Sequence, residues 1–400
     1  MAEKRTRVLI VGGGLVGLSL AAALGRVGIE TMVVDREAPE TTVAPPFDGR
    51  ASAIAAASWR MLQRLDVAQR IRDVQPIEEI RVSDGNAPLF LHYDHRDLGD
   101  EPLGQMVENR FTRRALLDTV AELDSVILAA PMSVGRLRRG QAGVEASLSD
   151  GTLVRAELCV AADGRPPRLR EEAGIDAIAR RYPQDGIVCT IAHELPHHAI
   201  AHERFLPAGP FAILPLTANR SSLVWTERSD LAPAFLELDD AAFAHEIQRR
   251  VGGFLGDLEV VGPRFRYPLT LVLAQDYHAH RLALIGDAAH GIHPIAGQGF
   301  NLGLRDVAAL TEILEEAAGI GMDLGDATLL ARYEQWRRTD SVVLAGVTDI
   351  LNRLFSNDLP PVRLVRDLGL AAVNRTKPLR RFFMRHAMGD VGDSPALLRR

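Results

Sequence analysis

The sequence has 400 residues, of which 47% are hydrophobic, and this supplies enough apolar material for a large core divided between two domains. Its net charge of −6 excludes a general electrostatic attraction to nucleic acid, and two cysteines are too few for a disulfide framework. The charged start, Met1 to Arg7, argues against a cleaved signal peptide, and no apolar run reaches membrane-spanning length, so we expect a cytoplasmic protein.

The first elements predict a nucleotide-binding unit. Val8 to Val11 is an apolar run typical of a buried parallel strand, and an Ala/Leu-rich helix is predicted from Leu18 to Val27. Between them lies a G-x-G-x-x-G match. In this motif Gly12 permits a tight turn, Gly14 lets a pyrophosphate approach the backbone, and Gly17 lets the helix pack closely on the strand.

A second strand, Thr31 to Val34, ends at Asp35. The first glycine of the motif and this acid are 35 − 12 = 23 residues apart, which agrees with the spacing of about 20 expected for a carboxylate that binds ribose hydroxyls. The order of strand, glycines, helix, strand and acid therefore predicts dinucleotide binding. It does not by itself distinguish FAD from NAD.

The chain up to residue 175 alternates between loops, helices and strands. The Pro/Thr-rich segment Glu37 to Arg50 is predicted to be a loop. Helices are predicted at Ala51 to Leu65 and at Asn109 to Leu123. Strand-like runs occupy Gln75 to Asp97, Val126 to Leu128, Val144 to Leu148 and Leu153 to Leu158, and the apolar run from Cys159 ends in the turn Asp163-Gly164.

The pattern of apolar and polar residues changes between residues 175 and 273. Short strand-like runs enclose one predicted helix, Asp240 to Phe254. The strands are predicted at Gly186 to His193, Phe211 to Leu216, Ser222 to Thr226 and Arg264 to Leu271. We interpret this part as an inserted α/β domain with its own sheet, and we place the substrate pocket at the junction of the two domains. We expect apolar residues of this sheet, such as Phe211, Ile213, Leu214 and Trp225, to shape the pocket.

A second motif follows the insertion. The apolar run ending Leu284-Ile285-Gly286 delivers Asp287 to a strand tip, a Pro/Gly-rich loop turns the chain, and a helix is predicted from Leu302. Backbone amides at a helix N-terminus favour an electron-rich, partly anionic group, while the aspartate can bind hydroxyls. Flavin with its ribityl chain combines these two features, so this motif favours FAD over NAD.

The three motifs, at Gly12 to Gly17, Asp163-Gly164 and Gly286-Asp287, resemble those of the class A flavoprotein monooxygenases, the para-hydroxybenzoate-hydroxylase-like group. The segment His293 to Asp306 is similar to the signature of the ubiquinone-biosynthesis hydroxylases within this group, as are Asp48 to Ala51 and Glu108-Asn109. One departure lies in the segment Asp163 to Arg168, which has proline where the Asp-Gly motif usually carries serine.

The resemblance implies an α/β fold, with a discontinuous Rossmann-like FAD-binding domain, an inserted mixed β-sheet substrate domain and a C-terminal helical region. We assign residues 1–75, 105–175 and 274–345 to the first, 76–104 and 176–273 to the second and 346–400 to the third. It also implies a set of FAD-binding residues. These are Gly12, Gly14, Leu15, Val16, Gly17, Asp35, Arg36, Arg50, Asn109, Arg113, Asp163, Asp287, Gly297, Gly299, Phe300 and Asn301.

By the same resemblance, Pro294 lines the reaction space, and His293 lies beside it. NAD(P)H is a transient electron donor, and Asp163 is linked to its use. The implied activity is hydroxylation of the aromatic ring of a polyprenylated phenol by O₂ through a flavin C4a-hydroperoxide, in ubiquinone biosynthesis. Two alternatives stay open. The same scaffold suits a plain FAD-dependent reductase or oxidase of a prenylated or aromatic substrate, or a non-catalytic flavin-bound subunit of a biosynthetic complex. A homo-oligomer or a ubiquinone-biosynthesis complex is the expected assembly.

Two further features have competing interpretations. Four histidines, His193, His197, His198 and His202, are irregularly spaced and lack a cysteine, which favours a solvated loop over a metal site, and we expect no metal. The segment Asn374 to Arg385 combines arginines with Phe382 and Phe383. It suits either peripheral contact with anionic lipid on the inner face of the cytoplasmic membrane or packing against the protein.

Overall fold

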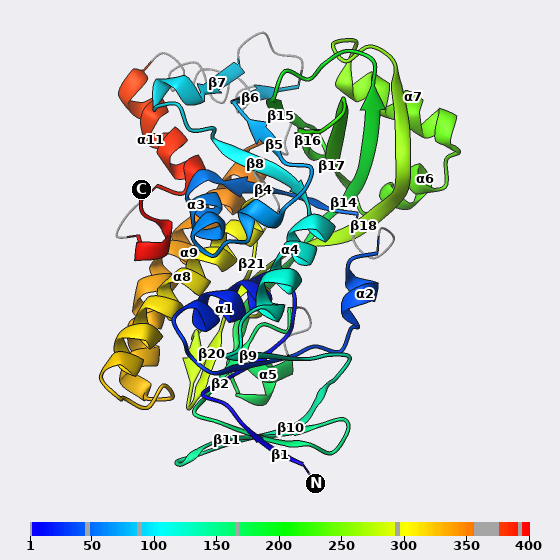
Figure 1. Ribbon diagram of the computed structural model, residues 1–400. Coiled ribbons are helices and arrows are strands. Elements are labelled where there is room, and N and C mark those ends of the chain that lie inside the picture. The colour runs from blue at the N-terminus through cyan, green and yellow to red at the C-terminus, as the bar shows by residue number, and fades with distance from the viewer. Residues whose placement is uncertain are drawn as a thin grey trace.

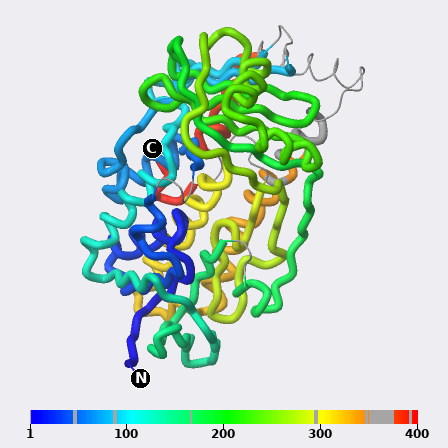
Figure 2. The backbone as a smooth tube through the Cα atoms, turned by 90° about the vertical axis from the view of Figure 1, so that its right-hand side faces the viewer, coloured from blue at the N-terminus to red at the C-terminus, as the bar shows by residue number. Residues whose placement is uncertain are grey.

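The computed structural model describes residues 2–44, 49–85, 90–164, 168–292, 297–355, 376–390 and 394–400. Two large sheets occupy opposite halves of the molecule, and long helices run along one side (Figure 1). In both views the N-terminus lies at one end and the green strands of the eight-stranded sheet at the other (Figure 2). The fold is therefore α/β, as the sequence predicts.

One half is built on a parallel sheet with the order β19-β20-β13-β2-β3-β9. All neighbouring strands are parallel except β19 and β20, and every residue of β3 and β13 is buried. Helix α1 contacts both α4 and α8. The strands span Val8–Val11 (β2), Thr31–Val34 (β3), Val126–Ala129 (β9), Leu158–Ala161 (β13), His278–Ala279 (β19) and Leu282–Leu284 (β20), and the helices span Leu15–Arg26 (α1), Asn109–Ala121 (α4) and Gln298–Gly319 (α8).

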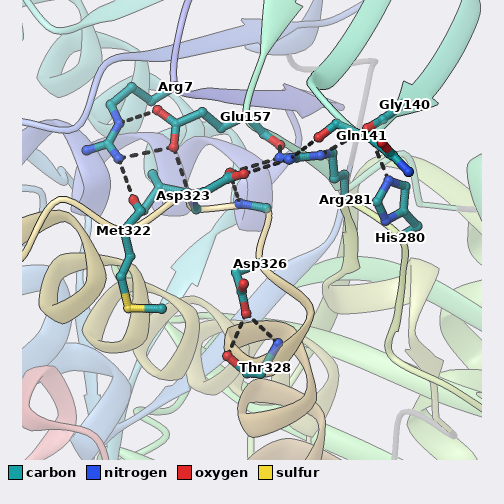
Figure 3. Close-up of polar contacts among 12 residues, drawn as sticks. Arg7, Gly140, Gln141, Glu157, His280, Arg281, Met322, Asp323, Asp326 and Thr328 are labelled. Carbon is teal, nitrogen blue, oxygen red and sulfur yellow. Dashed lines mark hydrogen bonds and ion pairs between the residues drawn. The ribbon is translucent and has the colours of Figure 1, made fainter.

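A smaller sheet with the order β1-β12-β11-β10 closes the far end of this half. Its strands are Glu3–Arg5 (β1), Val134–Gly140 (β10), Gly143–Leu148 (β11) and Leu153–Ala156 (β12). Arg281, just before β20, joins the two sheets to the segment after α8 through a bidentate pair with Asp323, at 2.6 and 2.8 Å, and through bonds to the carbonyls of Gly140 and Glu157 (Figure 3). This end of the molecule is thus fixed by charge-assisted hydrogen bonds.

The other half is an eight-stranded sheet with the order β21-β18-β14-β17-β16-β15-β6-β7. Its two long strands, β14 and β18, reach toward the parallel sheet, and β18 pairs with β21 directly after Asp287. The strands are Glu79–Asp84 (β6), Phe90–Asp94 (β7), Ala177–His193 (β14), Ile200–Leu206 (β15), Gly209–Leu216 (β16), Arg220–Arg228 (β17), Leu258–Ala274 (β18) and His290–Gly291 (β21).

The two faces of this sheet differ. One face packs against α7 (Asp240–Val251) and α6 (Ala232–Leu236) through an apolar core that includes Phe211, Trp225 and Phe243. We call this the outer face. The prediction that Phe211, Ile213 and Trp225 line the substrate pocket is therefore wrong, because their side chains are buried against α7. The opposite face, which we call the inner face, is directed toward the half that carries the parallel sheet. Its Ala201 and Leu216 share a core with Met106 of that neighbouring region.

The prediction of a helix from Ala51 to Leu65 is wrong at its start. Residues Ala51–Ala55 form strand β4, and only Ala56–Arg64 form the helix α3. The strand pairs with β8 (Gly104–Glu108), which also pairs with β5 (Gln75–Ile77). The amide of Ala55 donates to the Asn301 side chain at 2.8 Å, a contact across 246 residues. Such pairing overrides the helix propensity of alanine.

Other observed helices and strands also differ from their predicted bounds. Helix α1 begins at Leu15 rather than Leu18, and the predicted loop after Asp35 contains the short helix α2 (Pro39–Thr42). Strands β10 and β15 and helix α6 were not predicted. The chain closes with α9 (Ala327–Phe355) and α11 (Lys377–Met388). Among the described residues, no helix is long and apolar enough to cross a bilayer.

Candidate flavin site

Three strands of the parallel sheet deliver the three sequence motifs to one edge. Strand β2 leads into Gly12, β13 into Asp163 and β20 into Asp287, and because the strands are parallel their carboxyl ends lie together. Open α/β sheets bind ligands at this edge. The architecture therefore brings together motifs that are up to 287 − 12 = 275 residues apart in the sequence.

The glycines of the first motif have different surroundings. Gly12 has φ +112°, and a Cβ there would overlap the carbonyl oxygen of Ala162. A Cβ at Gly17 would overlap the carbonyl oxygen of Gly12. Gly14, by contrast, has no heavy atom within 4 Å of the position of a Cβ. Gly12 and Gly17 are thus required by packing, whereas Gly14 borders open space at the start of α1.

Val16 joins the first motif to the last. A Cβ at Gly286, where φ is +59°, would lie 3.3 Å from Val16, and one at Gly303 on α8 would lie 2.6 Å from it. Leu15 begins α1 and packs against the main core. Val16 therefore packs α1 against the Gly286 turn and α8.

Asp35 holds the glycine loop. Its carboxylate accepts hydrogen bonds from the amide of Gly13 and, at 2.7 Å, from that of Glu37. A carboxylate has about four acceptor positions, so about two remain for further donors. Arg36 is exposed beside Glu37, 3.6 Å from its carboxylate.

Asp163 carries a buried oxygen, Oδ1, with no hydrogen-bond partner. Its other oxygen accepts a long bond of 3.4 Å from the amide of Leu169. Burial raises the pKa of the Asp163 carboxyl, and the Leu169 amide opposes this shift. An orphaned buried oxygen beside the Gly12 loop is suited to a ligand donor, because leaving it unsatisfied is costly.

Three further residues of the predicted set approach from the region of β4 and α4. Arg50 is exposed and its guanidinium lies 5.1 Å from the ring centre of Tyr267 on β18. Asn109 is buried at the start of α4 and accepts from Ser52 at 2.6 Å. Arg113 is buried one turn later, so it shares the helix face of Asn109.

Asp287 is exposed, whereas every other residue from 281 to 292 is buried. Its carboxylate therefore lies at the sheet edge on a segment that is otherwise held by packing. At the start of α8, Gly297 adopts the left-handed conformation, φ +63°, and Gly299 borders open space. Phe300 packs on the core, and the Asn301 amide joins α8 to β4 by donating to the Ala53 carbonyl at 2.8 Å.

A buried polar network lies directly behind this loop, and sequence reasoning missed it. Asp306 on α8 accepts from the amide of Gly286 at 2.9 Å, His290 at 2.5 Å and Arg337 at 2.9 Å. Burial alone would raise the pKa of Asp306, but the His290 and Arg337 charges and the hydrogen bonds hold it below its ordinary value. The sequence did contain a signal for this network, because Asp306 is an ionisable residue on the apolar face of a predicted helix.

The predicted reaction-space residues His293 and Pro294 lie outside the described residues. Of the four clustered histidines, His193 is buried, with its ring nitrogens bonded to the Leu195 carbonyl and the Ser221 hydroxyl. His197 bonds the Leu216 carbonyl at 2.8 Å. The cluster is therefore partly built into the sheet rather than forming only a solvated loop.

Comparison with known proteins agrees with this geometry. An FAD-binding domain family model matches residues 5–343. Ubiquinone hydroxylase UbiL of Rhodospirillum rubrum is 52% identical over 100% of this chain and 94% of its own length. The 3-demethoxyubiquinol 3-hydroxylase of Escherichia coli is 34% identical over 97% of this chain and all of its own.

A solved structure shares the fold at low sequence identity. The p-nitrophenol 4-monooxygenase PnpA of Pseudomonas putida superposes with a TM-score of 0.81 at 20% identity, over 97% of this chain and 99% of that one. The chain belongs to the FAD-binding-domain family of aromatic hydroxylases. FAD is accordingly its cofactor, and it is an FAD-dependent monooxygenase.

Proposed function

We propose that this protein hydroxylates the aromatic ring of a polyprenylated phenol on the route to ubiquinone, with O₂ as oxygen donor and electrons from NAD(P)H or a separate reductase. The names of its relatives support this substrate class. The observation that carries the proposal is the convergence of Gly14, Asp163 and Asp287 at one edge of the parallel sheet.

We further propose which residues hold FAD. The open space at Gly14 admits the pyrophosphate, Asp35 binds the adenosine ribose and Asp287 binds a ribityl hydroxyl. Amides near Gly299 face the ring system, where the start of α8 stabilises negative charge. When bound, FAD supplies the activation of O₂ and the transfer of one oxygen atom to the substrate.

The inner face of the eight-stranded sheet is the proposed substrate wall. Its paired residues include Val188, Ala212, Leu214 and Val224, which are apolar and suit a ring that carries an isoprenoid tail. Such a wall excludes water from the reacting atoms, which limits wasteful release of hydrogen peroxide. We accordingly place the substrate region at 76–104 and 176–273 and the discontinuous cofactor region around it.

The test uses the FAD-loaded protein with O₂, NAD(P)H or a supplied reductase, and a short-chain prenylphenol. We expect a product heavier by one oxygen atom, labelled when ¹⁸O₂ is used. Oxidation or reduction of the ring without oxygen incorporation would instead support a reductase or oxidase. Flavin-containing protein that ignores every prenylphenol would support a non-catalytic subunit.

We also propose that α11 contacts the inner face of the cytoplasmic membrane. Met384 and Met388 are buried, so one side of this helix packs on the protein. On its exposed surface, Phe382 and Phe383 lie 53% and 39% exposed, with Arg381 beside them. Exposed aromatics next to a cation suit the interface of an anionic bilayer.

This contact is tested by co-sedimentation with vesicles that contain anionic lipid. Replacing Phe382 and Phe383 with serine should release the protein, while serine at the exposed Ile178 on β14 should not. Arg380 is a poor target because it pairs with Asp97 at 2.7 Å. Unchanged sedimentation of the double variant would exclude α11 as the lipid contact.

A further inference from the structure

Glu203 lies on the inner face of the eight-stranded sheet, in the middle of β15. Directly paired residues share a face, and Glu203 pairs with Ala212 on β16 and Val82 on β6. Ala212 alternates with Phe211 and Ile213, which belong to the core of the outer face. The carboxyl of Glu203 is therefore directed away from α7 and toward the half of the molecule that carries the flavin site.

The inner face meets the flavin site at two places. At one, Ala201 and Leu214 share a core with Ala53, whose carbonyl accepts from Asn301 at the start of α8. Ala201 is two residues before Glu203 and lies on the same face. At the other, Arg50 stacks on Tyr267 of β18. The inner face thus spans the loops proposed to hold FAD.

Glu203 is an unusual residue for this position. It is half-buried, it has no hydrogen bond or ion pair in the described part of the chain, and its paired neighbours are apolar. Burial raises the pKa of its carboxyl to about 7. The hydroxyl of Ser222, on β17 of the same face, is buried and without a partner. A buried hydroxyl without a partner is costly, and together with the unpaired carboxyl of Glu203 on the same face it points to a polar ligand.

We propose that Glu203 accepts the hydrogen bond, and then the proton, of the substrate's phenolic hydroxyl. This inference rests on the proposed function. In the step, the phenolic O–H bond breaks, the proton passes to a carboxylate oxygen of Glu203, and the electron pair stays on the phenolic oxygen. No electrons leave the substrate in this step. The resulting phenolate donates density to the ring carbons ortho and para to it, which makes them better nucleophiles toward the transferred oxygen.

The acidity of Glu203 suits this role. A phenol has a pKa of about 10, and an ordinary glutamic acid has a pKa of about 4.3. The two pKa values differ by about six units, so an ordinary carboxylate is too weak a base to remove the phenolic proton readily. With a carboxyl pKa of about 7 the gap falls to about three units, which brings proton transfer closer to balance. General bases matched in this way contribute roughly 10²- to 10⁴-fold in rate.

Other titratable groups face the same region. Asp84 on β6 and Tyr93 on β7 share the inner face, and Arg220 on β17 pairs with Glu108 at 3.0 Å. Burial raises the pKa of Tyr93 far above neutrality, so it stays protonated through the range of interest. A test must therefore separate Glu203 from these neighbours by substitution rather than by pH alone.

The test compares wild type with Glu203→Gln and, as the matched control, Glu259→Gln on β18, which removes an exposed carboxylate from the same sheet. The amide keeps a hydrogen-bond acceptor but cannot take a proton. We expect substrate affinity to change less than tenfold, kcat to fall about 100-fold, and the rise of kcat through pH 7 to disappear in Glu203→Gln only. A pH profile and kcat equal to wild type would overturn the proposal.

Binding gives a second measurement, made on the oxidised FAD-loaded wild-type protein without reductant, so that it stands even if the variant does not fold. Infrared difference spectra should show a carboxyl band that responds when the phenol binds, and no response to the phenol's methyl ether. A carboxyl band that does not change with either ligand would overturn the proposal. If wild type hydroxylates no prenylphenol, the proposed function itself fails, which is a different outcome.

Discussion

The network behind the flavin loop provides the sharpest prediction about stability, through the change Asp306→Asn. The substitution keeps the shape of the side chain but removes a charge that is fully buried. Arg337, itself 3% exposed, would keep only its 2.8 Å bond to Asp340, and His290 would lose its anionic partner. The substituted side chain has one carbonyl oxygen in place of two carboxylate oxygens. The Gly286 amide, which orients the loop carrying Asp287, would therefore compete with His290 and Arg337 for that oxygen.

Removing one partner from a buried ion pair costs about 3–5 kcal/mol, because the other charge stays buried without compensation. The side-chain carbonyl of the substituted amide still accepts one hydrogen bond, so we expect a loss of about 3 kcal/mol, near the lower end of that range. Asp118→Asn on α4 is the matched control. Its side chain is 50% exposed and lies 4.0 Å from Arg114, so solvent compensates for most of the lost charge.

The assay is urea unfolding of the FAD-free and FAD-loaded proteins at neutral pH, with FAD affinity measured by flavin fluorescence. Because the folded pKa of Asp306 is lowered, its stabilisation is complete above the unfolded value of about 3.9 and is lost as pH falls through the folded value. Wild type and variant should thus converge in acid. A loss below about 1 kcal/mol at neutral pH would refute the argument that this charge is a main support of the loop.

Four further substitutions test the cofactor edge and the far end of the parallel sheet. Asp287→Ala should give colourless but folded protein, and retention of stoichiometric FAD on purification would exclude its ribityl role. Gly14→Ala should weaken FAD binding at least tenfold without lowering the urea midpoint of the FAD-free protein, whereas Gly17→Ala should destabilise that protein by about 1–3 kcal/mol through overlap with the backbone. Arg281→Ala should lower stability by about 2 kcal/mol, read from urea unfolding, and leave the flavin spectrum unchanged.

The sequence by itself determined the cofactor class and the family. Its signals are local, because a tight turn, a close backbone approach and a strand-terminal acid each need particular residues at short spacings, as at Gly12, Gly17 and Asp35. It also predicted both β3 and the helix α4 from their residue patterns. The separate sheet of residues 175–273 followed from a change of periodicity.

Tertiary structure alone decided the features that depend on distant partners. Residues 51–55 look helical, yet they form a strand because β8 and Asn301 satisfy their backbone groups. In the sequence, Asp306 is simply an acidic residue in a predicted helix. Only the fold brings His290 and Arg337 to it and makes it the centre of a buried ionic network. The role proposed for Glu203 likewise depends on which face of β15 it occupies, and strand register is set by pairing between segments that local patterns do not specify.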